Sequence, residues 1–316
     1  MTKPESPQSE GVETGQKQDG QHWFAVLQAF LVTILWSSSF VIIKFGLLEI
    51  PPLIFAGLRY VVASLILLGA ALMVPAQRRT ITSLSRKWWG RLTVYGLVYY
   101  TVTMGTQFIG LALLDAIMVS FILNFTTIFV VFLAFFFLHE RPTKIQLLLV
   151  GVALVGTYFY FFPIDITASA FIGVLVVIVS LVANSFSAII GRDINRNQEL
   201  PPLTVTAISM SIGSILLLIA GLMATPFPVL TPLGILTILW LSVVNTALTF
   251  VLWNRAMQHL NAVEITIINS TMMAQIAILA LIFLNETPTL FDWIGIVLVM
   301  LAALLIQVFR RRSTDN

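Results

Sequence analysis

Residues 137–143 read Phe-Leu-His-Glu-Arg-Pro-Thr, and residues 283–289 repeat the pattern as Phe-Leu-Asn-Glu-Thr-Pro-Thr, 146 positions later. The same shift places the Ser-Phe pair at 39–40 over the Ser-Phe pair at 185–186. Matches that recur at one constant shift indicate that the chain is made of two related halves. This duplication decides how the rest of the sequence is interpreted.

The composition is that of a membrane protein. The 316 residues are 58% hydrophobic and 10% charged, with a mean hydropathy of +0.97. Soluble domains carry roughly 25% charged residues, so an ordinary soluble enzyme is excluded. From Trp23 onward the chain shows apolar runs of about 20 residues, the length at which a helix crosses a bilayer. The predicted spans are 23–45, 52–74, 90–111, 116–138, 144–162, 169–190, 203–223, 232–254, 262–284 and 290–308.

Ten spans in two halves predict an all-α integral membrane protein, with ten transmembrane helices in two five-helix repeats. Because five is odd, the second repeat must lie inverted relative to the first. Inverted repeats are typical of transporters, since two near-equivalent halves can open one central site to either side. We expect a disordered cytoplasmic tail at 1–22, the first repeat at 23–162, the second repeat at 169–308 and a basic cytoplasmic tail at 309–316.

The basic residues predict the orientation, because cytoplasmic loops carry an excess of Lys and Arg. With ten spans both termini lie on one side, and that side collects all but two of the 17 Lys and Arg residues. The exceptions are Lys44, on the opposite side, and Arg59, inside a span. We therefore expect both termini in the cytoplasm. This segregation explains the basic character of the chain without a nucleic-acid partner.

Several short motifs resemble the drug/metabolite transporter superfamily, in its EamA-like branch. They are Trp-Ser-Ser-Ser-Phe at 36–40, Pro-Pro at 51–52 followed by Arg59, and the doubled Glu-x-Pro-Thr after the fourth and ninth spans. The resemblance covers about residues 23–308. It implies transport of a small metabolite, often export of amino acids or related compounds, across a bacterial cytoplasmic (inner) membrane.

The sequence departs from this family pattern at three positions. The family often has Gly where Ser37 stands, and a helix-kinking Pro where Thr127 and Met273 stand. We expect these departures to change the shape of the central cavity and therefore the substrate.

Enzyme motifs are absent: the sequence contains no His-Glu-x-x-His, no phosphate-binding Gly-rich loop and no Gly-x-Ser-x-Gly. There is no cysteine, and His22, His139 and His259 are scattered, so we expect neither metal nor cofactor. Without a nucleotide-binding motif, transport should be secondary. The expected partners are a small-molecule substrate and the lipid bilayer, and a homodimer stays open. The alternative function is a membrane-embedded sensor or signalling protein on the same scaffold, without transport.

Polar side chains within spans are costly in hydrocarbon, so they should face the bundle interior or a water-filled cavity. The 146-residue shift pairs several of them at corresponding depths of the two halves, as a site on the pseudo-two-fold axis requires. The alternative is that the amides only bond neighbouring helices. The candidate substrate-binding residues are Trp36, Ser38, Tyr99, Asn124, Asn184, Asn245, Asn269, Ser270 and Gln275.

Three candidates, Trp36 among them, each have two interpretations. Arg59, about 10 Å down its span, either attracts a substrate carboxylate or acts as a structural clamp. Glu264 either binds a coupling proton or favours a helix N-terminus. Trp36 lies too deep for an interfacial belt, and forms either an aromatic wall of the cavity or ordinary helix packing. Glu140 and Glu286, before the Pro-Thr pairs, are better explained by capping and turn formation than by transport.

Overall fold

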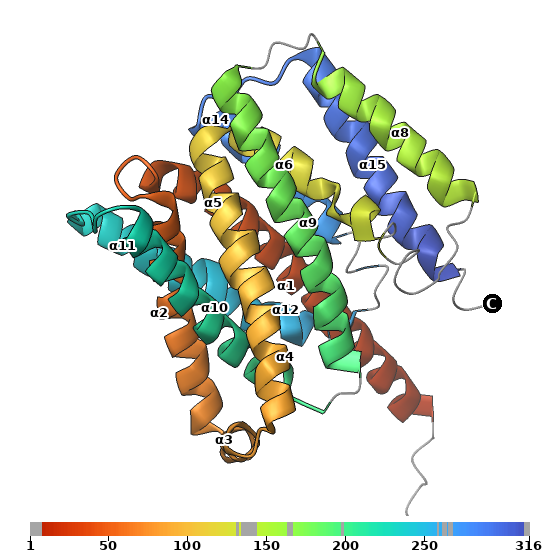
Figure 1. Cartoon of the computed structure of the whole chain (residues 1–316). Helices are drawn as coiled ribbons and strands as arrows, with labels where there is room; N and C mark the ends of the chain where they lie inside the picture. The colour runs from red at the N-terminus through yellow and green to blue at the C-terminus, as the bar shows by residue number, and fades with distance from the viewer. Residues whose placement is uncertain are drawn as a thin grey trace, which may run out of the picture.

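The computed structural model describes residues 8–130, 133, 144–162, 167–196, 199–257, 259–260, 264 and 268–312, and this part of the chain contains helices and connecting turns only (Figure 1). The helices of the first half are α1 Gln8–Gly46, α2 Pro52–Met73, α3 Pro75–Thr82, α4 Arg86–Gly96, η1 Leu97–Thr103, α5 Met104–Leu113, α6 Ala116–Asn124 and α8 Lys144–Tyr160. Those of the second half are α9 Ala168–Arg196, α10 Pro202–Ala224, α11 Pro232–Ser242, η2 Val243–Leu248, α12 Thr249–Ala256, α14 Met272–Phe283 and α15 Leu290–Arg312.

These helices confirm the predicted all-α membrane fold. Five are long and apolar enough to cross a membrane: Gln21–Gly46, Pro52–Met73, Ala168–Gly191, Pro202–Ala224 and Pro232–Trp253. Shorter apolar helices occupy the predicted fourth, fifth, ninth and tenth spans, at Ala116–Val130, Lys144–Tyr160, Ile268–Phe283 and Leu290–Ile306. The predicted third span is the continuous run of α4, η1 and α5.

The N-terminal segment differs from the prediction. The first helix begins at Gln8, whereas 1–22 was predicted to be disordered, and its apolar part begins at Gln21. The polar residues before Gln21 continue the helix, since an apolar helix that is already formed extends at little nucleation cost. Residues 1–7 lie outside the described part of the chain, as do Glu140, His139 and the end of the basic tail at 313–316.

Corresponding helices of the two repeats begin in the same way. Pro52 and Pro202 occupy the first positions of α2 and α10, where proline's fixed φ suits a helix start and its missing N–H removes no helical bond. These prolines belong to the Pro-Pro-Leu sequences that the two halves share. The repeat in the sequence therefore corresponds to a repeat in the structure, because equivalent helices of the two halves begin at equivalent prolines.

Helix packing has the symmetry expected of two inverted repeats. The helix pairs α2–α10, α6–α14 and α8–α15 each join equivalent helices of the two halves, and Figure 1 shows α8 beside α15 at one edge of the bundle. Other contacts occur in exchanged pairs: α5 packs on α9 as α12 packs on α1, and η1 packs on α10 as η2 packs on α2. Exchanging the two halves leaves these pairs of contacts unchanged.

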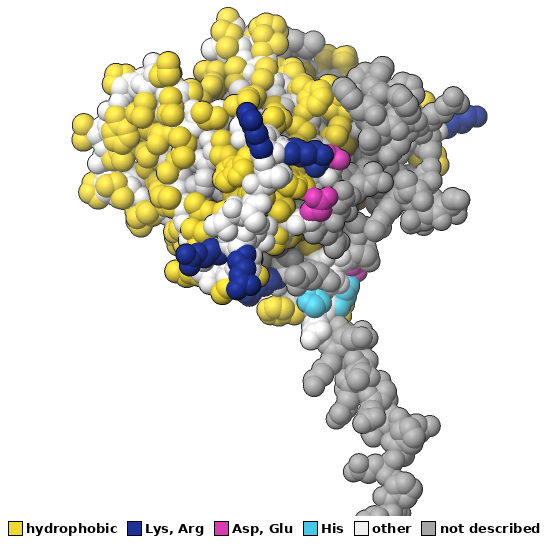
Figure 2. Space-filling view, turned by 60° about the horizontal axis from the view of Figure 1, so that its bottom comes forward, with side chains coloured by type: hydrophobic (Ala, Val, Ile, Leu, Met, Phe, Trp, Pro, Cys, Tyr) yellow, Lys and Arg dark blue, Asp and Glu magenta, His cyan; other side chains and the backbone are white. Residues whose placement is uncertain are grey.

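Apolar side chains cover much of the outer surface, including Leu65, Leu148, Phe171 and Ile282. Figure 2 shows hydrophobic residues over much of the described surface in view, with few Lys and Arg side chains among them. Water would make such a surface unstable, whereas lipid tails solvate it. The surface agrees with a protein embedded in a bilayer.

The repeats are joined at the end of the bundle where α1 ends and α6 begins, here called the distal end. The Glu286 carboxylate accepts hydrogen bonds from the backbone N–H groups of Ala116, at 2.7 Å, and Ile117, at 3.0 Å. Nearby, Lys44 donates to the backbone oxygen of Leu114 at 3.0 Å. Glu286 therefore caps a helix of the opposite repeat, as the capping interpretation requires.

The surroundings of Glu286 raise its pKa above the ordinary value. The main cause is partial burial, which disfavours the charged form, and the nearby Asp115 carboxylate adds to it. The two backbone N–H groups and Lys44 act in the opposite direction but do not outweigh burial.

Candidate functional site

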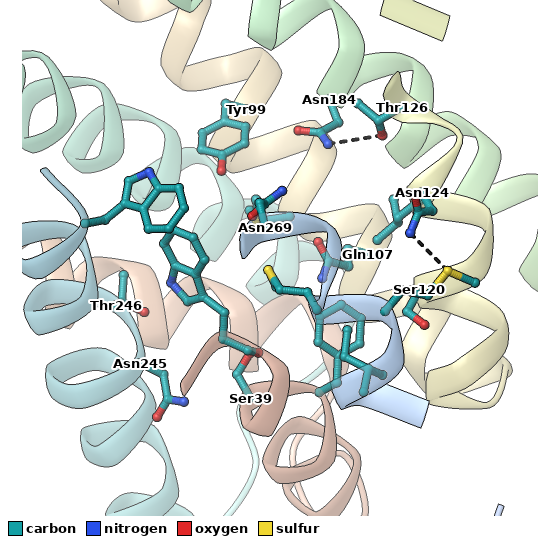
Figure 3. A pocket seen from close by; sticks show the side chains of 18 of the residues that line it. Ser39, Tyr99, Gln107, Ser120, Asn124, Thr126, Asn184, Asn245, Thr246 and Asn269 are labelled. Atoms are coloured by element: carbon teal, nitrogen blue, oxygen red, sulfur yellow. Dashed lines mark hydrogen bonds between the residues drawn. The ribbon is translucent and has the colours of Figure 1, made fainter. Parts of the chain in front are cut away.

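A cavity of about 510 Å³ lies between the two repeats, at the depth where both carry irregular helix segments. This volume falls within the range of roughly 300–1,000 Å³ that is typical of small-molecule sites. Figure 3 shows that its polar side chains come from several helices and converge on a common space. Among the predicted site residues, those that line it are Trp36, Arg59, Tyr99, Asn124, Asn184, Asn245, Asn269 and Ser270.

Two asparagines of the cavity wall, on the neighbouring helices α6 and α9, each donate one hydrogen bond to another helical segment. Asn124 Nδ2 donates to Met273 Sδ at 3.0 Å, and Asn184 Nδ2 donates to Thr126 Oγ1 at 3.3 Å (Figure 3). An amide has two donors and an acceptor with two lone pairs, so these contacts use only part of its capacity. Both side chains can therefore also bond a solute in the cavity.

The helices that carry Asn124 and Ser270 are interrupted beside the cavity at equivalent positions. Phe125 and Thr271, which are 146 residues apart, form turns between helical segments. Each N–H bonds the carbonyl three residues earlier, at 3.1 Å for Phe125 and 3.2 Å for Thr271. Interrupted helices near the middle of the membrane are a common way to build transporter sites. These breaks occur although the family's prolines are replaced here by Thr127 and Met273.

A second pair of irregular segments lines the cavity. The π-helices η1 and η2 begin at Leu97 and Val243, again 146 residues apart. They place Tyr99 and Tyr100 of the first repeat, and Asn245 and Thr246 of the second, on the cavity wall. A π-helical turn widens the helix and is often found at functional sites.

Aromatic rings form one side of the cavity. The Trp36 indole lies 5.1 Å from the ring of Trp253 and 6.3 Å from that of Phe250, measured between centroids. Its Nε1 donates to Thr249 Oγ1 at 3.0 Å, which fixes the ring orientation. Both earlier interpretations therefore apply, since Trp36 packs against helix α12 and also presents a surface to the cavity.

Arg59 belongs to the cavity lining and is 5% exposed. Its Nε donates to Thr246 Oγ1 at 3.0 Å and its Nη2 to the backbone oxygen of Asn245 at 3.4 Å. The Ser242 hydroxyl donates to the backbone oxygen of Arg59 at 2.9 Å. The side chain thus connects α2 to η2 while still facing the cavity, so clamping and anion contact do not exclude each other.

Two predicted binding residues do not line the cavity. Ser38 accepts from Asn245 Nδ2 at 3.1 Å and donates to its own helix. Gln275 bonds Thr33 at 3.1 Å, Ser37 at 2.9 Å and Thr271. Their polar groups are satisfied by helix–helix contacts, which corresponds to the packing alternative. The presence of a polar side chain within a span therefore does not by itself distinguish substrate binding from bonding between helices.

Glu264 lies outside the cavity. Its Oε1 is 3.0 Å from His22 Nε2, and both side chains are partly exposed to solvent at the end of the bundle that carries the termini. Its predicted role in proton coupling stays a prediction. In the described part of the chain, no group of His, Cys, Asp and Glu side chains is arranged to hold a metal ion.

Some lining residues were not identified from the sequence. Gln107 has the same intramembrane amide as Gln275 and could have been found by the same reasoning. Others, such as Thr126 and Thr127, carry hydroxyls that helices commonly satisfy internally, so their type carries little signal. Met104, Met272 and Met273 add flexible apolar surface, which a sequence cannot separate from ordinary core.

Comparison with known proteins identifies a family. The family model described as "EamA-like transporter family" matches residues 23–162 and 171–308, which correspond to the two repeats.

Curated relatives resemble the chain over most of their length. An uncharacterized transporter of Archaeoglobus fulgidus is 26% identical over 274 residues, covering 84% of this chain and 91% of the relative. The uncharacterized transporter YoaV of Bacillus subtilis is 25% identical over 288 residues, covering 87% and 91%. A crystal structure of a protein with 16% sequence identity covers 91% of this chain and 98% of its own, with a TM-score of 0.64. That structural likeness shows a shared fold.

Proposed function

The chain belongs to the EamA-like transporter family and is thus a multi-pass membrane transporter, and on that premise we propose that it exports an amino acid or related compound by alternating access. The observation that carries the proposal is the polar and aromatic cavity, which is lined by equivalent segments of both repeats. Because the two halves are nearly equivalent, they can exchange conformations and open the same site to either side.

The exposure of the lining side chains supports an arrangement that is open toward the end with the termini. Asn269, nearer that end, is exposed, whereas Ser120, nearer the distal end, is 5% exposed. Glu286 joins the repeats on the distal side through the N–H groups of Ala116 and Ile117. Transport would then require these distal contacts to separate while the opposite end closes.

Orientation is part of the proposal, with both termini in the cytoplasm of a bacterial cell and the distal end outside. We expect a reporter fused after Asn316 to be cytoplasmic and one inserted within 163–166 to be external, because basic residues are concentrated on the side of the termini. Activity of paired reporters that function on only one side of the membrane measures this. Two reporters on the same side would contradict the orientation and the span count.

A flux measurement tests the transport proposal directly. We expect proteoliposomes containing the purified chain to show saturable uptake of at least one member of an amino-acid panel. A thermal-shift screen of the same panel identifies the compound first, since a ligand that binds the folded state raises its apparent stability. A chain that binds a panel member without transporting it would favour the sensor alternative.

The amide side chains that line the cavity should contribute more to substrate flux than to the stability of the fold. We expect Asn124→Ala and Asn184→Ala to lower flux per folded molecule about tenfold, because each side chain faces the cavity. Each makes one bond to another helix segment, and such bonds stabilise membrane proteins by only about 0.6 kcal/mol.

Gln275→Ala is the matched control for these variants. Gln275 bonds three side chains outside the cavity, so its loss should lower thermal stability and leave flux per folded molecule nearly unchanged. The reverse pattern, with full flux in the asparagine variants and lost flux in Gln275→Ala, would contradict the assignment of the cavity.

A further inference from the structure

The cavity contains one formal charge. Arg59 is the only charged side chain among the described residues that line it, and no aspartate or glutamate belongs to that lining. Within the described part of the chain, Arg59 also forms no salt bridge. A buried charge is costly unless an opposite charge and hydrogen bonds compensate it. The empty cavity is therefore electropositive beside Arg59.

The contacts of Arg59 leave donors available. A guanidinium has five N–H groups, and the described contacts use two of them, one on Nε and one on Nη2. The guanidinium carbon lies 5.2 Å from the centroid of the Tyr60 ring and 6.0 Å from that of Phe108. These rings attract a cation but do not neutralise it. A carboxylate matches the remaining planar donors because it can accept two parallel bonds.

We propose that Arg59 forms a head-group subsite that binds the carboxylate of the substrate. Its guanidinium is held beside this subsite by Thr246 Oγ1 and by the Asn245 backbone oxygen. The proposal rests on the transport function above and specifies the substrate of that cavity. Trp36 and Phe250 then face the rest of the substrate, which favours an apolar or aromatic group. Amines and amides without a carboxylate leave the Arg59 charge uncompensated.

Three probes that differ only in the head group test the subsite on the unmodified full chain. They are phenylalanine, phenylalaninamide and 3-phenylpropionate, with leucine, leucinamide and 4-methylpentanoate as an aliphatic set. Thermal shift and competition for proteoliposome flux measure their binding. We expect the amides to bind roughly 30-fold or more weakly than the amino acids, because truncating one partner of a buried charge pair carries a large penalty. The acids without ammonium should keep most of the affinity, because they keep the carboxylate that Arg59 binds.

Variants assign this selectivity to Arg59. We expect Arg59→Gln to remove most of the acid-over-amide preference, and Arg59→Lys to keep part of it by retaining the charge. The matched control is Arg255→Gln, because Arg255 is an exposed cation of α12 that does not line the cavity, and it should keep the full preference. If Arg59→Gln does not fold, the comparison of the probes on the unmodified chain still tests the subsite.

The outcomes separate the subsite from the transport proposal. Saturable flux with equal competition by amino acids and amides would overturn the subsite and leave transport standing. Binding of the amino acids with the expected preference, but without flux, would support the subsite and contradict transport. No binding by any carboxylate probe would overturn the subsite.

Discussion

Gly57→Ala is expected to destabilise the folded protein, although alanine is the better helix former. Gly57 lies on α2 where this helix meets α10, and a Cβ built there would lie 2.7 Å from the Cα of Leu218 and 2.8 Å from its Cβ. The obstacle includes backbone, so the helices would have to move apart along a contact that joins the two repeats. Forcing extra atoms into a packed core costs about 1–3 kcal/mol. A lower midpoint of thermal unfolding in detergent would measure the effect.

Gly69→Ala is the matched control, because Gly69 is on the same helix and a Cβ there would meet nothing within 4 Å. Replacing an unconstrained helical glycine by alanine stabilises by roughly 0.5–1 kcal/mol, so this variant should be unchanged or slightly more stable. Opposite effects in the two variants would show that close packing against α10 is responsible. Equal effects would contradict the observed approach of the two helices.

The sequence predicted the helices well because the bilayer imposes a simple rule on them. Apolar runs and prolines at helix starts, such as Pro52 and Pro202, locate the elements within a few residues. The 146-residue repeat predicted the inverted arrangement, and helix packing agrees with it. The beginning of α1 at Gln8 was missed, because a polar segment shows no hydrophobic signal whether it is helical or not.

The candidate site was predicted only in part, because sequence reports the depth of a side chain better than its direction. Asn124 and Gln275 are both amides inside spans, yet one lines the cavity and the other bonds between helices. The direction depends on local helix geometry, and the π-helices η1 and η2 have no proline or glycine motif that marks them in the sequence. Their positions became apparent only as a symmetric pair in the fold.

The contact between Glu286 and α6 should control access to the cavity from the distal end. We expect Glu286→Ala to favour opening there, because it leaves the N–H groups of Ala116 and Ile117 without their acceptor. A buried donor that loses its partner costs about 1–3 kcal/mol, and about 1.4 kcal/mol corresponds to a tenfold change in an equilibrium. The distal-open fraction should therefore rise roughly tenfold or more.

The natural absence of cysteine allows a direct measurement of this opening. A single Ser120→Cys places a thiol on the cavity wall one turn into α6. With the proposed orientation, an impermeant maleimide added to intact cells reports access from the distal side. Labelling should be slow in this background and about tenfold faster when Glu286→Ala is added. Asp292→Ala is the control, because among the described residues the Asp292 carboxylate accepts only from the Thr289 N–H at the start of its own helix. This variant should leave the rate unchanged.

The same assay has an expected dependence on pH. The pKa of Glu286 is raised above 4.5 in the closed arrangement, mainly by burial, and should return toward its ordinary value when the distal end opens to water. Glu286 then binds its proton more tightly in the closed state than in the open state. Protonation therefore stabilises the closed state: this extra stability is fully present below the ordinary pKa of Glu286 and is lost as pH rises through its raised pKa. Labelling of Ser120→Cys should slow as pH falls through this window, once corrected for thiol reactivity, and Glu286→Gln should abolish the dependence. Faster labelling in acid would mean that the hydrogen bonds from the Ala116 and Ile117 N–H groups lower the pKa of Glu286 by more than burial raises it. Protonation would then favour opening of the distal end.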